Sequence, residues 1–370
     1  MISAQITGIV IAVQANYYWV KCDRIQGDLD QGDRNSQSSS ALPQATLLCT
    51  RRDRLRKMGQ KVMVGDRVTV EEINWDSQRA AICQVLPRQT ELDRPPVANA
   101  DQILLVFAFA QPAIDPVQLS RFLVKAETSG IKVQLCLTKC DLVSPDIQQQ
   151  WRDRLMTWSY DPILISVYQH QGLETLRQRL SDRITVVSGP SGVGKSSLIN
   201  ALLPQLKLRV SSVSGKLERG RHTTRHVELF QLASGGLLAD TPGFNQPDLD
   251  CAPIALAHCF PEVRSRLQQN SCQFSDCLHR DEPGCGVRGS WERYDLYLKF
   301  LDDAIAYQTK LRQQTEPEAI LKAKTSANGK INYEMRLDRS KYRRESRKTR
   351  QQSMQVMKGK VIDWLEQEPE

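Results

Sequence analysis

A glycine-rich segment in the second half of the chain constrains the fold more than any other feature. An apolar run at Ile184–Ser188 leads into it, and an apolar helical pattern follows it. The segment consists of Gly189, Pro190, Ser191, Gly192, Val193, Gly194, Lys195, Ser196 and Ser197. This is the phosphate-binding loop motif in the strand–loop–helix context that it requires. We therefore expect an α/β domain that binds a nucleotide through this segment.

The chemistry of the loop follows from its residue types. Glycines let backbone N–H groups converge on a phosphate, and the N-terminus of the next helix adds to the attraction. Lys195 is expected to reach the β- and γ-phosphates, and the Ser196 hydroxyl is expected to bind Mg²⁺. The motif does not identify the base.

A second phosphate-side segment, Asp240-Thr241-Pro242-Gly243, follows an apolar strand expected at Gly236–Ala239. In GTPases, an Asp at this place holds Mg²⁺ through water, and the glycine N–H contacts the γ-phosphate. The tetrapeptide alone is also a good turn sequence. Its position downstream of a phosphate loop favours the functional interpretation for Asp240 and Gly243.

The segment Thr138-Lys139-Cys140-Asp141 closes an apolar strand at Ile131–Leu137 and resembles a guanine-recognition motif. A carboxylate such as Asp141 accepts from the two N–H groups on the edge of guanine, which adenine lacks. Lys139 would cover the base, and Thr138 stands where GTPases usually carry Asn. Ser166, at the end of the next expected strand, is placed to contact the guanine carbonyl. If the match is accidental, the chain is a P-loop ATPase or kinase instead.

The order of these motifs is unusual, because the base-recognition segment precedes the phosphate loop in the chain. Strands alternate with helices between residues 98 and 250, which predicts a parallel sheet covered on both faces. A circularly permuted sheet still brings such loops to one edge, because the site depends on where the loops lie in space. We therefore expect residues 98–250 to form a permuted P-loop GTPase domain.

Residues 1–90 predict a small β-barrel of the oligonucleotide-binding (OB) type. Five strands are expected at residues 8–13, 17–22, 45–50, 61–72 and 79–86, and residues 87–100 are expected to be a linker. One connection of the barrel is basic, with Arg51, Arg52, Arg54, Arg56 and Lys57. Such loops bind RNA in barrels of this type. The alternative is an unspecialised barrel with solvated arginines.

Five of the ten cysteines lie between Cys251 and Cys285. In a chain expected to be soluble and to lack a secretory signal, such clustering indicates a metal site rather than disulfides. Three thiolates and one imidazole make a closed tetrahedral zinc set, and they are supplied by Cys272, Cys277, His279 and Cys285. No open coordination position is evident, so we expect a structural zinc in a helical module at residues 251–314. The alternative is a set of free cysteines.

The net charge of +8 is concentrated near the C-terminus. From Arg336 to Lys360 there are ten Lys or Arg and two acidic residues, so the rest of the chain sums to zero. A basic extension at residues 315–370 binds nucleic acid by releasing counterions from phosphates, or it remains a disordered end.

The apolar patterning does not predict a membrane protein. The longest unbroken apolar run, Ile103–Ala110, is far shorter than the roughly 20 residues of a membrane span. No Lys or Arg precedes Lys21, so a secretory signal would lack its basic region. We expect a cytoplasmic protein without a membrane partner, and a monomer, because no coiled-coil pattern is evident.

The barrel, the permuted motifs and the cysteine cluster together resemble the circularly permuted GTPases of small ribosomal subunit biogenesis, the RsgA type. The likeness covers about residues 1–310 and includes Gly220-Arg221-His222-Thr223-Thr224, which is similar to the first switch of that family. By this resemblance Thr224, or Thr223, binds Mg²⁺ and His222 positions or activates water. Phe244 stands where Ras-like enzymes keep a catalytic Gln, and a Phe cannot orient water.

The resemblance implies a GTP hydrolase that acts late in assembly of the small (30S) ribosomal subunit. It further implies rRNA binding, stimulation of hydrolysis by the subunit, and GTP and GDP as ligands with Mg²⁺. The family carries the same zinc ligand pattern as this chain. A second alternative is an RNA-binding module that uses the nucleotide only as a switch.

Overall fold

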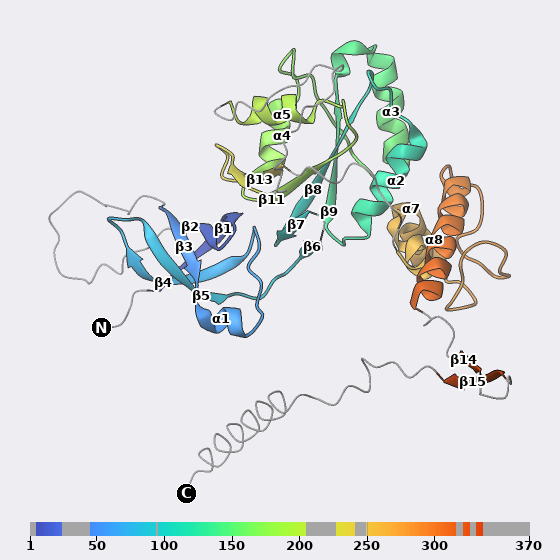
Figure 1. Cartoon of the computed structure of the whole chain (residues 1–370). Coiled ribbons are helices and arrows are strands. Elements are labelled where there is room, and N and C mark those ends of the chain that lie inside the picture. Colours follow the sequence, from blue (N-terminus) through green and yellow to red (C-terminus); the bar gives the residue numbers. More distant parts are fainter. Residues whose placement is uncertain are drawn as a thin grey trace, which may run out of the picture. The chain divides into compact units, whose positions relative to one another are not determined.

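The computed structural model describes residues 5–23, 45–93, 95–204, 227–240, 249, 251–315, 321–325 and 331–335 (Figure 1). These residues belong to two compact units, residues 1–308 and residues 309–370. The first unit contains a barrel, a helix-covered sheet and a small helical module. The second unit includes an antiparallel hairpin of β14 (Leu321–Thr325) and β15 (Ile331–Met335), which the sequence did not predict.

The N-terminal strands close into a barrel in the order β1-β2-β3-β5-β4, which confirms the predicted barrel. Its strands are β1 (Ile6–Gln14), β2 (Tyr17–Cys22), β3 (Thr46–Arg51), β4 (Arg67–Asn74) and β5 (Arg79–Val85). Alternate residues point inward, as in β2, where Tyr18, Val20 and Cys22 are buried. The short helix α1 (Asp53–Lys57) carries the basic connection and is anchored by buried Leu55.

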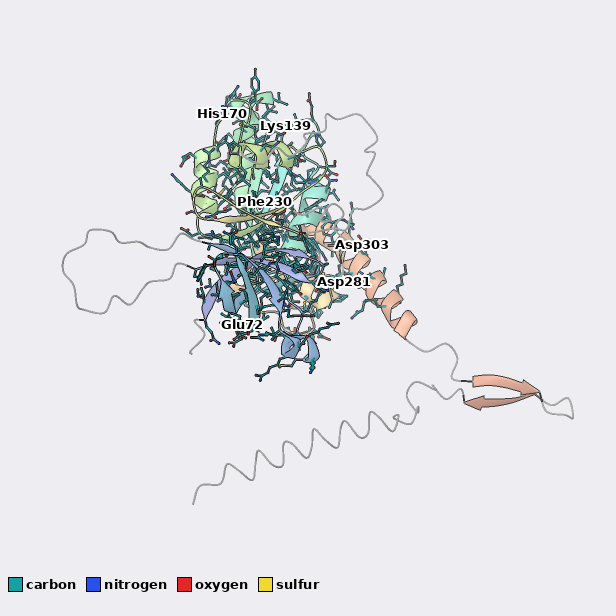
Figure 2. All side chains as sticks on the ribbon, turned by 60° about the vertical axis from the view of Figure 1, so that its left-hand side comes forward. Glu72, Lys139, His170, Phe230, Asp281 and Asp303 are labelled. Atoms are coloured by element: carbon teal, nitrogen blue, oxygen red, sulfur yellow. The ribbon has the colours of Figure 1, made fainter. Side chains whose placement is uncertain are left out.

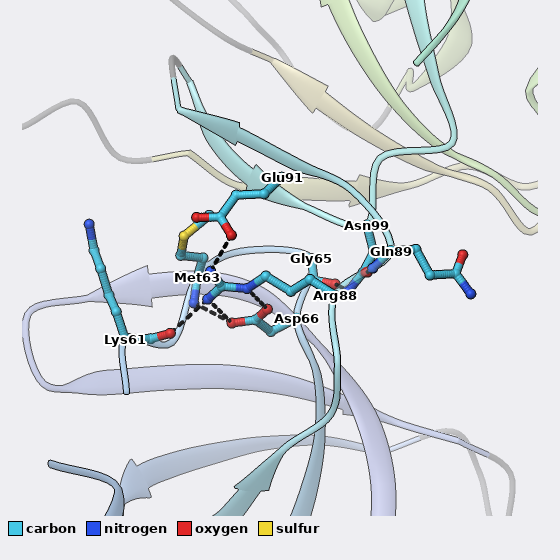
Figure 3. A network of polar contacts seen from close by, with 8 residues as sticks. All are labelled: Lys61, Met63, Gly65, Asp66, Arg88, Gln89, Glu91 and Asn99. Atoms are coloured by element: carbon cyan, nitrogen blue, oxygen red, sulfur yellow. Dashed lines mark hydrogen bonds and ion pairs between the residues drawn. The ribbon is translucent and has the colours of Figure 1, made fainter. Parts of the chain in front are cut away.

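The fourth strand begins later than the sequence indicated, at Arg67 rather than residue 61. The preceding apolar residues are buried in a turn that the Asp66 carboxylate organises (Figure 3). Asp66 is fully buried and accepts hydrogen bonds from the Met63 N–H at 2.7 Å and from Arg88 Nε at 2.7 Å. Gly65 has a φ of +87°, and a Cβ there would lie 2.0 Å from the Ala98 carbonyl oxygen. Burial in this stretch therefore reflects a tight turn and not a strand.

This turn contacts the segment expected to be a linker. That segment instead forms a small hairpin of β6 (Glu91–Asp93) and β7 (Pro96–Ala98). Asn99 Nδ2 donates to the Gly65 carbonyl oxygen at 3.0 Å, and the Ala98 N–H donates to the Val64 carbonyl oxygen at 2.8 Å. The chain thus passes from barrel to sheet through a hydrogen-bonded connection.

The central domain is built on a six-stranded sheet in the order β10-β9-β8-β11-β13-β12. Only the pairing of β12 with β13 is antiparallel. The strands are β8 (Gln102–Ala108), β9 (Lys132–Thr138), β10 (Ile163–Leu164), β11 (Ile184–Ser188), β12 (Leu229–Gln231) and β13 (Leu237–Asp240). Every residue of β8 and β11 is buried, as expected for central strands of a parallel sheet.

Helices cover both faces of this sheet (Figure 1). Helices α2 (Pro116–Glu127) and α3 (Pro145–Thr157) pack on one face, and α4 (Leu173–Leu180) and α5 (Lys195–Leu202) pack on the other. The helix starts are encoded locally, because Asp115 caps α2 by accepting from the Val117 N–H, and each of α2 and α3 begins with proline. The predicted doubly covered α/β domain is confirmed.

A helical module follows, with α6 (Pro253–Leu256), α7 (Pro261–Gln269) and α8 (Tyr294–Thr315). Arg293, just before α8, is fully buried, and its guanidinium carbon lies 4.6 Å from the ring centroid of Trp158. Its Nη2 donates to Glu262 at 2.5 Å. Because Trp158 follows α3, this cation joins the module to the central domain. Among the described residues, no helix combines the length and the apolar character needed to cross a membrane.

Candidate functional site

The phosphate loop joins β11 to α5 through three glycines with positive φ. These angles are +141° at Gly189, +82° at Gly192 and +91° at Gly194. The loop leaves the sheet in close contact with β8, since a Cβ at Gly189 would lie 2.1 Å from the Val106 carbonyl oxygen. Residues with a side chain rarely adopt these backbone conformations, so the glycines allow the loop to turn here.

Lys195, the first residue of α5, lies across its own loop. Its Nζ donates to the carbonyl oxygens of Gly189 at 2.8 Å and Pro190 at 2.5 Å. Ser191, Gly192 and Ser196 are exposed, whereas Val193 is buried. The loop therefore presents one side to solvent and packs the other against the sheet.

The base-recognition segment lies directly against this loop. Thr138 Oγ1 donates to the Val193 carbonyl oxygen at 2.5 Å, and Lys139 Nζ donates to the Gly192 carbonyl oxygen at 2.9 Å. Lys139 also donates to the carbonyl oxygen of Gln111. The structure thus brings the two motifs together in space, although they are reversed in the sequence.

The loop that carries Ser166 joins the same edge. The Cys140 N–H donates to the Ile165 carbonyl oxygen at 3.2 Å, which ties the loop after β9 to the loop after β10. Ser166 is buried, and its Oγ accepts from the Gln169 N–H at 3.0 Å. Asp141 is half-buried in the one-turn 3₁₀ helix η1 (Cys140–Leu142). In Figure 2, the label Lys139 marks the loop after β9 and the label His170 marks the loop after β10.

Several predicted site residues lie outside the described part of the chain. These are His222, Thr223, Thr224 and Gly243, together with the side chain of Asp240. The backbone of Asp240 is described and pairs with Val187 in the parallel ladder between β13 and β11. The end of β13 is therefore adjacent to the strand that leads into the phosphate loop.

Sequence reasoning missed the contribution of the loop after β8. The carbonyl oxygen of Gln111 accepts from Lys139, and a Cβ at Gly192 would lie 3.6 Å from Pro112 Cδ. The only available signal was position, because this loop leaves the same edge of a parallel sheet as the recognised motifs.

The cysteine-rich module brings Cys272, Cys277, His279 and Cys285 together. Their ligand atoms all lie within 4.8 Å of one another. The His279 Nδ1 lies 3.5 Å from Cys272 Sγ and 3.4 Å from each of the Cys277 and Cys285 sulfurs. Bonds of about 2.3 Å to sulfur and 2.0 Å to nitrogen at tetrahedral angles would separate these atoms by roughly 3.6 Å. The four side chains therefore fit one tetrahedral metal ion.

Surrounding groups contact two of these four residues, Cys285 and His279. The N–H groups of Val287 and Arg288 donate to Cys285 Sγ at 3.4 and 3.3 Å. Partial burial raises the pKa of the Cys285 thiol, but these donors, together with hydrogen bonds from Cys277 and Cys272, lower it by more, so that pKa lies below its usual value. The Tyr294 hydroxyl donates to the His279 carbonyl oxygen at 2.9 Å. Within the described residues, no other cluster of His, Cys, Asp or Glu has metal-binding geometry.

Comparison with known proteins agrees with this geometry. The family model for the RsgA GTPase matches residues 85–250. The chain is 61% identical, over 95% of its length and 97% of the relative, to a protein of Trichormus variabilis named small ribosomal subunit biogenesis GTPase RsgA. A protein of the same name from Microcystis aeruginosa is 52% identical over 98% of both chains.

Two crystal structures share the fold. YjeQ from Thermotoga maritima superposes with a TM-score of 0.66 at 31% identity, covering 82% of this chain and 99% of that one. YloQ, described as a circularly permuted GTPase, superposes with a TM-score of 0.62 at 30% identity, covering 85% of this chain and 98% of that one. With its reversed motifs meeting at one sheet edge, the chain belongs to the RsgA GTPase family and is a GTP-hydrolysing enzyme.

Proposed function

We propose that this GTPase acts late in the assembly of the small ribosomal subunit, binds its rRNA, and hydrolyses GTP faster when the subunit is bound. The observation that carries the proposal is the near full-length identity of 61% to a relative named for small ribosomal subunit biogenesis. With such a partner, we propose that the protein acts in the cytoplasm. We propose that it acts there as a monomer and that residues 1–90, 98–250, 251–314 and 315–370 are its functional parts.

The nucleotide lies, in this proposal, along the edge formed by the loops after β9, β10 and β11. Asp141 accepts from the guanine edge, Lys139 covers the base, and Ser166 lies beside the guanine carbonyl. The backbone of residues 189–197 cradles the phosphates. Lys139 Nζ already lies 2.9 Å from the Gly192 carbonyl oxygen, which supports one continuous site for base and phosphate.

The hydrolytic step needs charge neutralisation and an oriented water. Lys195 supplies positive charge at the β- and γ-phosphates, and the Gly243 N–H contacts the γ-phosphate. Mg²⁺, when bound with GTP, neutralises the phosphate charge, and Ser196, Thr224 (or Thr223) and Asp240 would hold it. His222 orients the attacking water, because Phe244 has no polar group for that role.

Contacts to rRNA come from three parts of the chain. In the basic connection of the barrel, Arg54, Arg56 and Lys57 are exposed on α1. Arg51 and Arg52 have structural partners, because Arg51 donates to the Gln60 carbonyl oxygen at 2.7 Å and Arg52 pairs with Glu71 at 2.8 Å. We assign the exposed three to phosphate contacts. The zinc module and the basic extension provide the other contacts.

The metal in the cysteine module is zinc in this proposal, and its role is structural. Three sulfurs and one imidazole nitrogen are the donor set that suits Zn²⁺. The Sγ to Nδ1 distances of 3.4 to 3.5 Å support a closed four-coordinate site. Its contribution is to fix residues 272–285 as one rigid surface.

The proposal is tested by GTP hydrolysis with and without purified small subunits, at several salt concentrations. The expected result is strong stimulation by small subunits and little by large subunits. His222→Ala should abolish the stimulated rate, whereas His226→Ala, four positions further along the same segment, should keep it. Hydrolysis that small subunits do not change at moderate salt would contradict the proposed partner. ATP bound as well as GTP would favour the ATPase alternative.

A further inference from the structure

We infer that Thr138 is a positioning residue for the phosphate loop and makes no contact with the guanine base. This inference rests on the proposed nucleotide site. It concerns the position at which the chain departs from the usual Asn of the guanine-recognition motif. An Asn amide can donate to the N7 atom of guanine, which only accepts hydrogen bonds.

The Thr138 hydroxyl is already hydrogen-bonded within the protein. The residue is 2% exposed, and its Oγ1 lies 2.5 Å from the Val193 carbonyl oxygen and 3.1 Å from the Phe107 carbonyl oxygen. A hydroxyl has one proton to donate. Both neighbours are acceptors, and the shorter contact takes the proton. No donor is left for guanine N7.

The contact orients a peptide plane of the phosphate loop. In a trans peptide, the C=O and the next N–H point in opposite directions. Holding the Val193 carbonyl toward Thr138 therefore turns the Gly194 N–H the other way, toward the cradle for phosphate. Gly194, at a φ of +91°, has no Cβ to restrict rotation of this plane, so the contact with Thr138 helps to fix it.

The neighbouring residue repeats the arrangement. Lys139 Nζ donates to the carbonyl oxygen of Gly192, the residue before Val193, at 2.9 Å. Two consecutive residues of β9 and its loop thus hold two consecutive carbonyls of the phosphate loop. Both N–H groups that follow these carbonyls, those of Val193 and Gly194, are fixed by the pair. The base-recognition segment accordingly acts on the phosphates as well as on the base.

The inference predicts a specific pattern of nucleotide affinities. The wild type should bind 7-deaza-GTP, which carries a C–H in place of N7, within about twofold of GTP. Thr138→Val removes the hydroxyl at nearly constant shape and leaves the buried Val193 carbonyl without a donor. It should weaken GTP, GDP and 7-deaza-GTP alike, by about tenfold, because all three carry a β-phosphate.

Matched variants separate this role from a general loss of structure. Thr138→Ser restores the hydroxyl and should bring each affinity back to within about threefold of the wild type. Thr128→Val removes a hydroxyl that donates to the backbone carbonyl of Lys125 at 2.7 Å on the far end of α2, and it should leave affinities unchanged. The 7-deaza comparison on the wild type needs no variant and stands even where Thr138→Val fails to fold.

Two results would overturn the inference. One is a wild type that binds 7-deaza-GTP more than tenfold more weakly than GTP. The other is a Thr138→Val protein that keeps its affinities or loses only the preference for GTP over 7-deaza-GTP. Failure of the proposed nucleotide site has a different outcome, namely that the wild type does not prefer GTP to ATP.

Discussion

The side-chain nitrogen of Lys139 lies 2.9 Å from the carbonyl oxygen of Gly192 in the phosphate loop. The two residues belong to motifs that appear in reversed order along the chain. They lie in the loops after β9 and β11, and β8 separates these strands in the sheet. Strand order in the sheet, not order in the sequence, decides which loops meet. The permuted chain therefore assembles one edge at which base and phosphate loops are in direct contact.

The first prediction concerns the glycine that opens the phosphate loop. In Gly189→Ala, the new Cβ would lie 2.1 Å from the Val106 carbonyl oxygen, at a φ of +141°. Neither backbone can move without disturbing the sheet, so we expect a loss of roughly 3 kcal/mol in the free energy of unfolding. Gly59→Ala is the control, because it also has positive φ, +68°, but meets nothing within 4 Å. It should cost only about 1 kcal/mol in urea unfolding. Equal losses would contradict the close approach.

The second prediction concerns the buried carboxylate between barrel and sheet. Asp66→Ala leaves the Met63 N–H without its acceptor and removes the buried carboxylate that pairs with Arg88, so we expect a loss of about 3 to 5 kcal/mol. Glu91→Ala removes the exposed partner of the same arginine, with a side chain 48% exposed, and should cost under about 1 kcal/mol. Both are measured by denaturant unfolding. A small effect of Asp66→Ala would show that the turn does not depend on this network.

The third prediction concerns the metal cluster. Cys277→Ser weakens one of four ligands, so zinc content measured on purified protein should fall from one per chain to less than about a tenth. Cys83→Ser is the control, because Cys83 lies in the barrel and its sulfur contacts the Thr69 carbonyl oxygen. It should keep the full zinc content. Unchanged zinc in Cys277→Ser would exclude that thiol as a ligand.

The fourth prediction concerns pH and the barrel core. Burial raises the pKa of Cys22 to about 11 and that of Cys49 to about 12, from a usual value near 9. The unfolded chain therefore loses these protons first as pH rises. Stability from the neutral thiols is complete below pH 9 and is lost between about pH 9 and 12. The double variant Cys22→Ala, Cys49→Ala should show a shallower decline in unfolding free energy from pH 8 to 10. A decline as steep as that of the wild type would contradict the linkage.

Much of the fold was predictable because its signals are local. The apolar runs of β8 and β11 and the glycine spacing at Gly189–Gly194 identify the sheet and its loop without distant information. The apolar pattern at residues 61–66 wrongly predicted a strand. These apolar side chains fill a turn that is organised by Asp66. The three-residue strand β12 was missed because it is too short for an alternating pattern.

The site was predictable in its residues but not in its contacts. The sequence identifies Thr138 as a departure from a motif, yet the partner of its hydroxyl, Val193, is set by the tertiary arrangement. The same holds for Gln111, whose only contribution is a backbone carbonyl. Backbone acceptors carry no residue-type signal, so sequence patterns do not reveal them.

The most direct test of the permuted site is to exchange the group that recognises the base. In Asp141→Asn, the amide replaces one acceptor by a donor, which suits xanthine instead of guanine. We predict that this variant loses at least about a hundredfold in GTP affinity and gains XTP binding and hydrolysis, while Asp146→Asn, on α3, behaves as the wild type. A variant that still binds GTP normally and ignores XTP would show that Asp141 does not reach the base, and would contradict a single guanine site shared by the reversed loops.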